Sequence, residues 1–165
     1  MRVLGVDPGT RIVGYGIVEQ KGNRIVPVHF GAVRADREAD YPARLRCIFR
    51  GLQDVLREHR PDVIAIEEAF YGRNAAAALR MGEGRGVAIV ATTTSDLPLF
   101  QYTPTEVKKA VVGNGHAHKS QVQEMVRIIL GLKAAPTPED AADALAVAIC
   151  HCNRIQAGGS LIGLG

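Results

Sequence analysis

The chain has 165 residues, 47% of them hydrophobic and 22% charged, which fits one folded domain and excludes an intrinsically disordered protein. No window approaches the roughly 18 uncharged apolar residues of a transmembrane helix, and no secretory signal precedes the first strand, so we expect a cytoplasmic protein. The net charge of +3 is uneven, because residues 71–135 carry 8 basic and 4 acidic side chains, and this favours that segment for contact with a polyanion.

The N-terminal part of the chain predicts three strands, near residues 2–7, 12–19 and 24–34. A Pro8-Gly9 turn separates the first two strands, which we expect to form a hairpin. Apolar residues at intervals of three and four predict an amphipathic helix over 41–59. Residues 62–66 are apolar on both faces and predict a buried strand of the kind found inside a parallel sheet.

Helices dominate the rest of the chain. The first, rich in alanine and glycine, is expected over 74–94, and its small residues Ala78, Gly82 and Gly86 form a stripe that another helix could approach, in the same chain or in a second copy. The remaining predicted elements are a strand at 99–102, a helix at 104–112, a basic loop at 113–119, a helix at 120–130 capped by Ser120, and a last helix at 138–155.

This order of elements predicts an α/β fold. We expect a mixed five-stranded sheet, with the first three strands antiparallel and helices on both faces. No repeat or linker divides the chain, so a single domain is expected over residues 1–156. A flexible glycine-rich tail is expected at 157–165.

Carboxylates stand at the ends of two predicted strands. Asp7 ends the first strand, at the edge where open α/β sheets place their active sites. Asp-Pro-Gly is also good turn chemistry, so position alone leaves a functional and a turn role open for Asp7. Glu67 and Glu68 follow the buried strand. Because a strand alternates faces, only one of them can face the crevice that Asp7 faces, and spacing does not decide which.

Two more carboxylates lie in the last helix. Asp140 fits the acidic third residue of a capping box begun by Thr137, which gives it a structural explanation. Asp143 has no such explanation, because the helix around it is apolar on nearly all sides and a buried carboxylate must be paired or bind a metal. Three residues apart, both side chains project from one face of the helix.

These carboxylates point to a metal site. Four of them converging without cations would repel one another and raise each other's pKa values. Ligands that are all oxygen select hard cations, so Mg²⁺ is the expected cofactor, with Mn²⁺ as a substitute. Two such ions activate a water and stabilise the leaving oxygen in phosphodiester hydrolysis. The residues therefore predict metal-dependent phosphoryl transfer, of the kind a nuclease performs.

With these residues placed, the chain resembles the RuvC family of bacterial Holliday-junction resolvases, over roughly residues 2–155. Each matching motif is weak alone, and their order and spacing together are highly specific. The motifs are Gly5–Thr10, Gly14–Gly16, Ala65–Glu67 with Phe70, Arg85–Ala88, Val111–Gly115, Lys119–Val122 and Asp140–Ala146.

The resemblance implies a ribonuclease-H-like fold with Asp7, Glu67, Asp140 and Asp143 as catalytic carboxylates and metal ligands, and it selects Glu67 over Glu68. It further implies a homodimer whose two sites nick symmetric strands of four-way junction DNA, in recombination and DNA repair. The products carry 5′-phosphate and 3′-hydroxyl ends. The branch-migration complex RuvA–RuvB is the partner that the family implies.

Further residues are candidates for DNA contact. Phe70 leaves the active-site strand, where an aromatic ring could stack on an unpaired base, although a core position explains it too. Lys119 lies in a matched motif and is a candidate for phosphate contact. Five more phosphate-contact candidates, for which a solvated surface is an equal alternative, are Arg73, Arg80, Arg85, Lys108 and Lys109.

Three other functions are compatible with parts of this pattern. Sugar-kinase and actin-like ATPases also begin with a strand-end Asp, but they need a second domain for which 165 residues leave little room. Small RuvC-like RNA-processing nucleases share the strand-end Asp and would cleave RNA. A non-catalytic junction-binding module would not need all four carboxylates.

Overall fold

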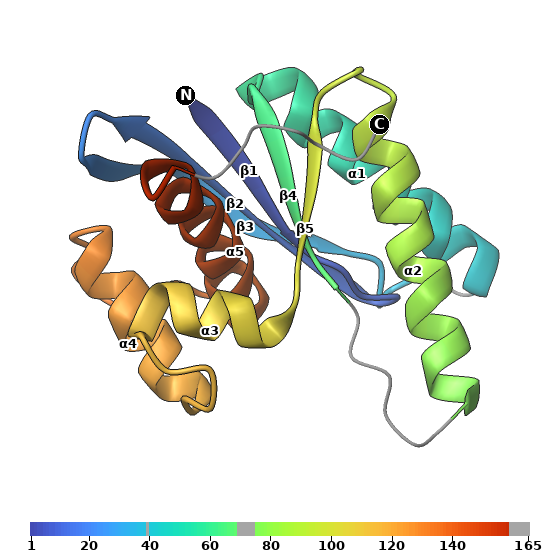
Figure 1. The fold of residues 1–165 in the computed structure, drawn as a ribbon. Coiled ribbons are helices and arrows are strands. Elements are labelled where there is room, and N and C mark those ends of the chain that lie inside the picture. Colours follow the sequence, from blue (N-terminus) through green and yellow to red (C-terminus); the bar gives the residue numbers. More distant parts are fainter. Residues whose placement is uncertain (39, 69–74, 159–165) are drawn as a thin grey trace.

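The fold is built around a five-stranded mixed sheet with the strand order β3-β2-β1-β4-β5 (Figure 1). The computed structural model describes residues 1–38, 40–68 and 75–158. The first three strands are antiparallel neighbours, whereas β4 runs parallel to β1 and β5 parallel to β4, so the predicted sheet is confirmed. In order, the strands are Arg2–Asp7, Ile12–Lys21, Arg24–Arg34, Val63–Glu67 and Leu99–Tyr102.

Helices cover both faces of the sheet (Figure 1). On one face lie α1 (Tyr41–His59) and α2 (Ala75–Thr93); on the other lie α3 (Pro104–Val112), α4 (Lys119–Ile129) and α5 (Glu139–Gln156). Each face has its own hydrophobic core, and the sheet separates the two. In the described part of the chain, no helix has the length and apolar character needed to cross a membrane.

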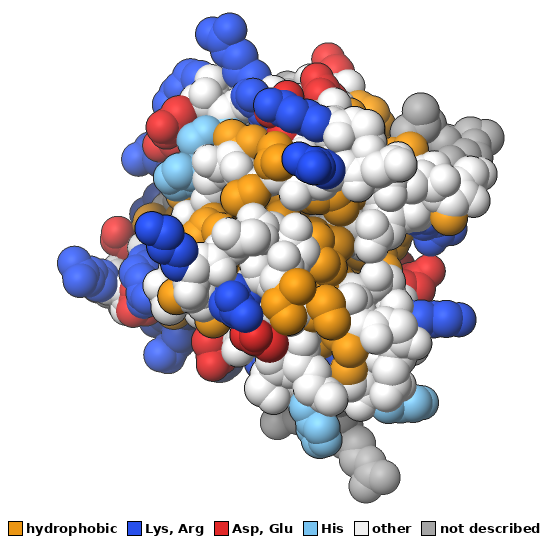
Figure 2. All heavy atoms as spheres, turned by 90° about the vertical axis from the view of Figure 1, so that its left-hand side faces the viewer, with side chains coloured by type: hydrophobic (Ala, Val, Ile, Leu, Met, Phe, Trp, Pro, Cys, Tyr) orange, Lys and Arg blue, Asp and Glu red, His pale blue; other side chains and the backbone are white. Residues whose placement is uncertain are grey.

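The side of the molecule that carries α3, α4 and α5 is seen in Figure 2. Hydrophobic side chains reach the surface there as a strip, with Lys and Arg side chains along one side of it and above it. The apolar side chains exposed on these elements include Ile128 of α4, at 53%. Scattered apolar exposure of this kind is ordinary for a protein surface.

The alternation of side chains along β1 decides which face Asp7 serves. Val3 packs in the core under α5, and a Cβ atom placed on Gly5 would point at the backbone of α5. Leu4 and Val6 pack in the opposite core, under α1 and α2. Because a strand has a period of two, Asp7 lies on the α5 side of the sheet.

Glycines allow α5 to approach β1 and β2 closely. A Cβ atom on Gly5 would lie 2.0 Å from the carbonyl oxygen of Ala144, and one on Gly14 would lie 1.9 Å from that of Asp140. Atoms cannot approach so closely, so any side chain at these positions would push the helix away. The contact holds the first turn of α5 against the end of β1, because Gly14 is the partner of Asp7 across the β1–β2 ladder.

Two helix starts differ from the prediction. Helix α4 begins at Lys119 after His118, and the side chain of Gln121 accepts a hydrogen bond from the His118 N–H at 2.8 Å, so the prediction that Ser120 caps this helix was wrong. At α5 the N-cap is Pro138, which follows a cis peptide bond and provides no side-chain cap. Thr137 therefore starts no capping box, and the structural explanation for Asp140 falls away.

The small-residue stripe of α2 does not pack against another helix of the described chain, as one of the two predicted arrangements required. Gly84, which lies between the stripe positions, is buried against the β1–β2 turn, where an added Cβ would lie 2.9 Å from the carbonyl oxygen of Gly9. Around Gly82 and Gly86 an added Cβ would meet nothing within 4 Å in the described part of the chain. The stripe therefore does not mediate helix packing within the described chain.

Replacing Gly14 with alanine tests the close approach of α5. Because the new methyl group would overlap the Asp140 carbonyl, we expect Gly14→Ala to lower the free energy of unfolding by about 3 kcal/mol, measured by urea unfolding. The control is Gly82→Ala, which meets open space and should raise helix stability by about 0.5–1 kcal/mol. A Gly14→Ala protein as stable as wild type would contradict the packing described for α5.

Candidate active site

Asp7 and Glu67 lie side by side at the carboxyl ends of neighbouring strands. The parallel register pairs Val6 with Ile66, so the next residue of each strand is a carboxylate. Ile66 packs in the core of the α1–α2 face, and the alternation of β4 therefore turns Glu67 toward α5 and Glu68 away. The choice between the two glutamates, which spacing left open, follows from the register of β4.

Helix α5 brings Asp140 and Asp143 to the same edge of the sheet. The backbone of Asp140 rests on Gly14, next to Asp7. Asp143 lies one turn further along and lines a cleft of about 210 Å³ together with Glu67. The full lining of this cleft is Glu67, Pro104, Val107, Lys108, Lys119, Val122, Asp143 and Ala146.

Two lysines face these carboxylates across the cleft. The ammonium group of Lys119, at the start of α4, lies 2.8 Å from Oδ2 of Asp143 and 3.2 Å from Oε2 of Glu139. Lys108 of α3 lines the same cleft and lowers the pKa of Glu67. The cleft therefore combines a group of carboxylates with ammonium groups on its opposite wall.

The carboxylates make one another harder to ionise. Burial, followed by repulsion from Glu67, Asp143 and Asp140, raises the pKa of Asp7 to about 8. Burial and the charge of Asp143 raise the pKa of Glu67 to about 7. Burial also raises the pKa of Asp143, although Lys119 opposes this shift. A site that keeps this much repulsion in the folded state is typical of a functional centre.

The residues of the cleft fit a hard divalent cation by donor type. The converging side chains offer carboxylate oxygens, which Mg²⁺ and Mn²⁺ prefer, and their mutual repulsion is what a cation would remove. Among the described residues, no three or more His, Cys, Asp or Glu side chains are arranged so that they could hold a metal ion together. Lys119 supplies the positive charge beside Asp143.

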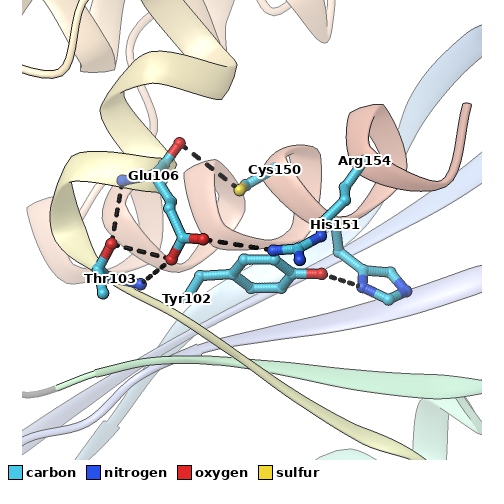
Figure 3. A network of polar contacts seen from close by, with 6 residues as sticks. All are labelled: Tyr102, Thr103, Glu106, Cys150, His151 and Arg154. Carbon is cyan, nitrogen blue, oxygen red and sulfur yellow. Dashed lines mark hydrogen bonds and ion pairs between the residues drawn. The ribbon is translucent and has the colours of Figure 1, made fainter. Parts of the chain in front are cut away.

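A polar network, buried at Tyr102 and His151 and exposed at Glu106 and Arg154, links α3 to α5 (Figure 3). Tyr102 ends β5, and its hydroxyl forms a hydrogen bond of 2.7 Å with Nδ1 of His151 on α5. Burial lowers the pKa of His151 to about 4, so this pair is neutral near pH 7. Arg154 lies over the Tyr102 ring at 5.7 Å and forms an ion pair of 3.3 Å with Glu106 of α3. The network sets where α3 presents Lys108 to the cleft.

The start of α3 is fixed by a capping box that uses the same glutamate. The Thr103 side chain accepts a hydrogen bond from the Glu106 N–H, and Oε2 of Glu106 accepts one from the Thr103 N–H at 2.8 Å. Cys150 points at the Glu106 carbonyl, 3.8 Å away, whereas its neighbour His151 points at Tyr102. The sequence Cys150-His151-Cys152 thus serves packing between α3, β5 and α5.

The predicted DNA-contact residues lie in different places. Lys108 and Lys119 line the carboxylate cleft. Lys109 lines a separate groove between α3 and α5, with Glu106 and Arg154. Phe70 and Arg73 lie outside the described residues.

Glu139 was missed by sequence reasoning, although it shares the ammonium group of Lys119 with Asp143. A signal for it was available in its spacing. It lies four residues before Asp143, so both project from one side of α5.

Comparison with known proteins decides the family. A family model described as crossover junction endodeoxyribonuclease RuvC matches residues 3–151. The chain belongs to the RuvC family. A RuvC of this description from Trichlorobacter lovleyi is 52% identical over 162 residues, covering 96% of this chain and 90% of the relative. One from Geotalea uraniireducens is 48% identical over 161 residues, covering 98% and 94%.

Solved structures agree with this family. A structure described as Thermus thermophilus RuvC has a TM-score of 0.85 and 38% identity, covering 96% of this chain and 97% of that one. T. thermophilus RuvC in complex with a Holliday junction substrate has a TM-score of 0.88 at 38% identity, covering 96% of each chain. The yeast mitochondrial resolvase Ydc2 shares the fold, with a TM-score of 0.66 at 16% identity. The predicted RuvC resemblance and ribonuclease-H-like fold are confirmed.

Removing one carboxylate is expected to stabilise the metal-free protein. The pKa of Asp7 is raised from its ordinary value of 3.8 to about 8 in the folded state. Between about pH 4 and 8 the folded state therefore keeps a proton on Asp7 that the unfolded state has already lost. Stability therefore falls as pH rises through this window. At pH 8 in EDTA we expect Asp7→Asn to gain about 2 kcal/mol, or roughly 4–8 °C in Tm, by calorimetry.

The same comparison at pH 4 provides the control. There Asp7 is protonated in the folded state and partly protonated in the unfolded state, so the difference between Asp7→Asn and wild type should be only a small fraction of that at pH 8. A variant that is less stable than wild type at pH 8 would show that the carboxylates do not repel one another as described.

Proposed function

We propose that this RuvC-family protein resolves Holliday junctions, nicking two symmetric strands in a metal-dependent reaction that leaves 5′-phosphate and 3′-hydroxyl ends. The observation that carries the proposal is the cleft in which Glu67 and Asp143 face Lys108 and Lys119, with Asp7 and Asp140 at the same edge of the sheet. Carboxylates can bind divalent cations, and the ammonium groups on the opposite wall can contact the phosphodiester. The proposed nuclease domain spans residues 1–156.

In this reaction the four carboxylates Asp7, Glu67, Asp140 and Asp143 hold the metal, for which we propose two Mg²⁺ ions, replaceable by Mn²⁺. When bound, the ions activate a water and stabilise the leaving oxygen. Glu67 and Asp7 are fixed by adjacent strands and the two aspartates by α5, so the backbone places all four at one edge of the sheet.

Lys119 has a second task beside neutralising Asp143. Its side chain is 54% exposed and lies on the wall of the cleft, within reach of a phosphate. If Asp143 binds a cation, its ion pair with Lys119 is no longer needed, and the Lys119 ammonium group is free to contact the phosphodiester. Lys108 contacts the phosphate from α3. Lys109, Phe70 and Arg73 remain proposed DNA contacts.

For the homodimer we propose the apolar groove between α1 and α2. It has a volume of about 720 Å³ and is lined by Leu45, Arg46, Phe49, Arg50, Glu83, Gly86, Val87 and Val90. Val90, which lines this groove, is 56% exposed. A two-fold interface needs complementary groups on one patch, which Arg50 and Glu83 provide.

Family membership also supports a place for the protein in the cell. We propose that it acts in the cytoplasm, together with the branch-migration complex RuvA–RuvB, in recombination and DNA repair. The dimer would place two cleavage sites on one junction, which matches the two symmetric strands that must be cut.

A cleavage assay on a labelled synthetic four-way junction tests the proposed activity. A linear duplex of the same sequence serves as the comparison substrate, and each is incubated with Mg²⁺ or with EDTA. We expect paired nicks at symmetric positions in the junction, with Mg²⁺ only. Equal cutting of junction and duplex, or cutting of RNA in preference to the junction, would overturn the proposal.

Asp143→Asn tests the proposed catalytic role, with Glu139→Gln as its matched control. Both carboxylates contact Lys119, but Glu139 is 72% exposed and Asp143 is 24% exposed. We expect Asp143→Asn to lower the cleavage rate at least 100-fold and to keep junction binding, whereas Glu139→Gln cleaves at close to the wild-type rate. Equal losses in the two variants would argue against a special role for Asp143.

Val90→Glu tests the proposed dimer interface. Burying a carboxylate without a partner is costly, so we expect this variant to sediment as a monomer at concentrations where wild type is a dimer. Ile128→Glu is the control, because Ile128 is exposed to a similar degree, 53% against 56%, on α4. Dissociation by both variants, or by Ile128→Glu alone, would move the interface elsewhere.

A further inference from the structure

A second groove lies on the other side of the β1–β2 turn from the carboxylate cleft. Its volume is about 610 Å³, and the turn, α1 and α2 form its walls. Three of its residues are arginines: Arg11 after the turn, Arg44 on α1 and Arg80 on α2. The other lining residues are Thr10, Tyr41, Ala76, Leu79 and Glu83. We refer to it as the arginine groove.

The arginine groove carries an excess of positive charge. Its one carboxylate, Glu83, accepts a hydrogen bond of 2.5 Å from the Tyr41 hydroxyl. None of the three guanidinium groups forms an ion pair within the described part of the chain, in contrast to Arg57 of α1, which pairs with Asp54. A guanidinium group has five N–H donors and no acceptor, so an anion is the ligand that satisfies it.

One of these donors is already buried. Nε of Arg44 is shielded from solvent and has no hydrogen-bond partner among the described residues. A buried donor without a hydrogen-bond partner destabilises the protein, and a ligand that accepts a hydrogen bond from it removes this penalty. Planar guanidinium groups bind phosphate and carboxylate oxygens through two parallel hydrogen bonds, and DNA phosphates are the anions that the proposed substrate supplies.

The arginine groove lies close to the proposed cleavage site. Thr10, at its edge, is three residues after Asp7, so their Cα atoms are at most about 11 Å apart. Gly84 of α2 packs directly on Gly9 and Thr10, which fixes the wall of the groove to this turn. A DNA strand rises about 3.4 Å per nucleotide, so the groove is within reach of phosphates about three nucleotides from the cleft.

We propose that the arginine groove binds phosphodiester groups of the junction on the far side of the β1–β2 turn from the scissile phosphate. This inference rests on the proposed function and names a second DNA contact for it. Arg44 and Arg80 bind phosphate oxygens, and Arg11 closes the groove from the turn. The contact reads no base sequence, because it is made to the backbone. It holds the DNA on both sides of the turn that carries Asp7.

The test is the salt dependence of junction binding, measured by fluorescence anisotropy with a labelled four-way junction in EDTA. Each phosphate contact contributes about 0.9 to the slope of log K against log salt concentration. We expect the double variant Arg44→Gln with Arg80→Gln to lose about 2 from this slope and at least 10-fold in affinity near 0.1 M salt.

Two variants complete the experiment. Arg57→Gln removes the same charge from α1 about 20 Å from Arg44 along the helix, and it should leave the slope unchanged. The double variant Arg44→Lys with Arg80→Lys keeps the charge and should recover most of the slope, which a merely unfolded protein would not do. Recovery by lysine and no effect at Arg57 would establish phosphate contact in the groove.

Other results would overturn the proposal in distinguishable ways. A wild-type slope in the Gln double variant would show that the groove does not meet DNA, while the proposed resolvase activity would stand. Loss of the dimer in sedimentation by the Gln double variant would assign the groove to the contact between subunits. A wild-type protein without preference for the junction would overturn the proposed function, and the groove's role with it.

Discussion

The close contact between α5 and the strands β1 and β2 is the constraint on which the site depends. A helix normally keeps its distance from a sheet because side chains on both surfaces occupy the space between them. Here Gly5, Gly14 and Gly16 face α5, and an added Cβ at any of them would lie within 2.6 Å of an atom of the helix. The helix therefore rests on the strand backbone and brings Asp140 and Asp143 to the strand end that carries Asp7.

Hydrophobic packing holds these carboxylates together against their repulsion. Residues 144–150 of α5 are buried almost completely, and the Tyr102–His151 hydrogen bond fixes the same helix to β5. The folded state thus accepts an electrostatic cost at one end of α5 and offsets it by burial along the rest of the helix. Lys119 relieves part of the repulsion. In physical terms, the core keeps these carboxylates close together at one end of α5.

Much of the fold could be predicted from the sequence, because its patterns are local. Strand and helix positions followed from periodicity. Asp7 was noticed because it ends an apolar strand, and Asp143 because it is a carboxylate in an apolar helix. What failed were contacts set by tertiary structure. Helix α5 begins after Pro138, which has no side-chain group to cap it, and at the start of α4 the His118 N–H donates to the Gln121 side chain, without a cap from Ser120. The arginine groove joins Arg11, Arg44 and Arg80 from three separate elements, and no spacing rule connects them.

The sheet divides the molecule into two layers of helices that carry different grooves. The carboxylate cleft belongs to the layer of α3, α4 and α5, whereas the arginine groove and the apolar groove belong to the layer of α1 and α2. Two separate cores meet only through the strand backbones. Substitutions in the two layers should then add in free energy. Substitutions in the proposed subunit and DNA contacts of one layer can therefore leave the carboxylate cleft in the other layer unchanged.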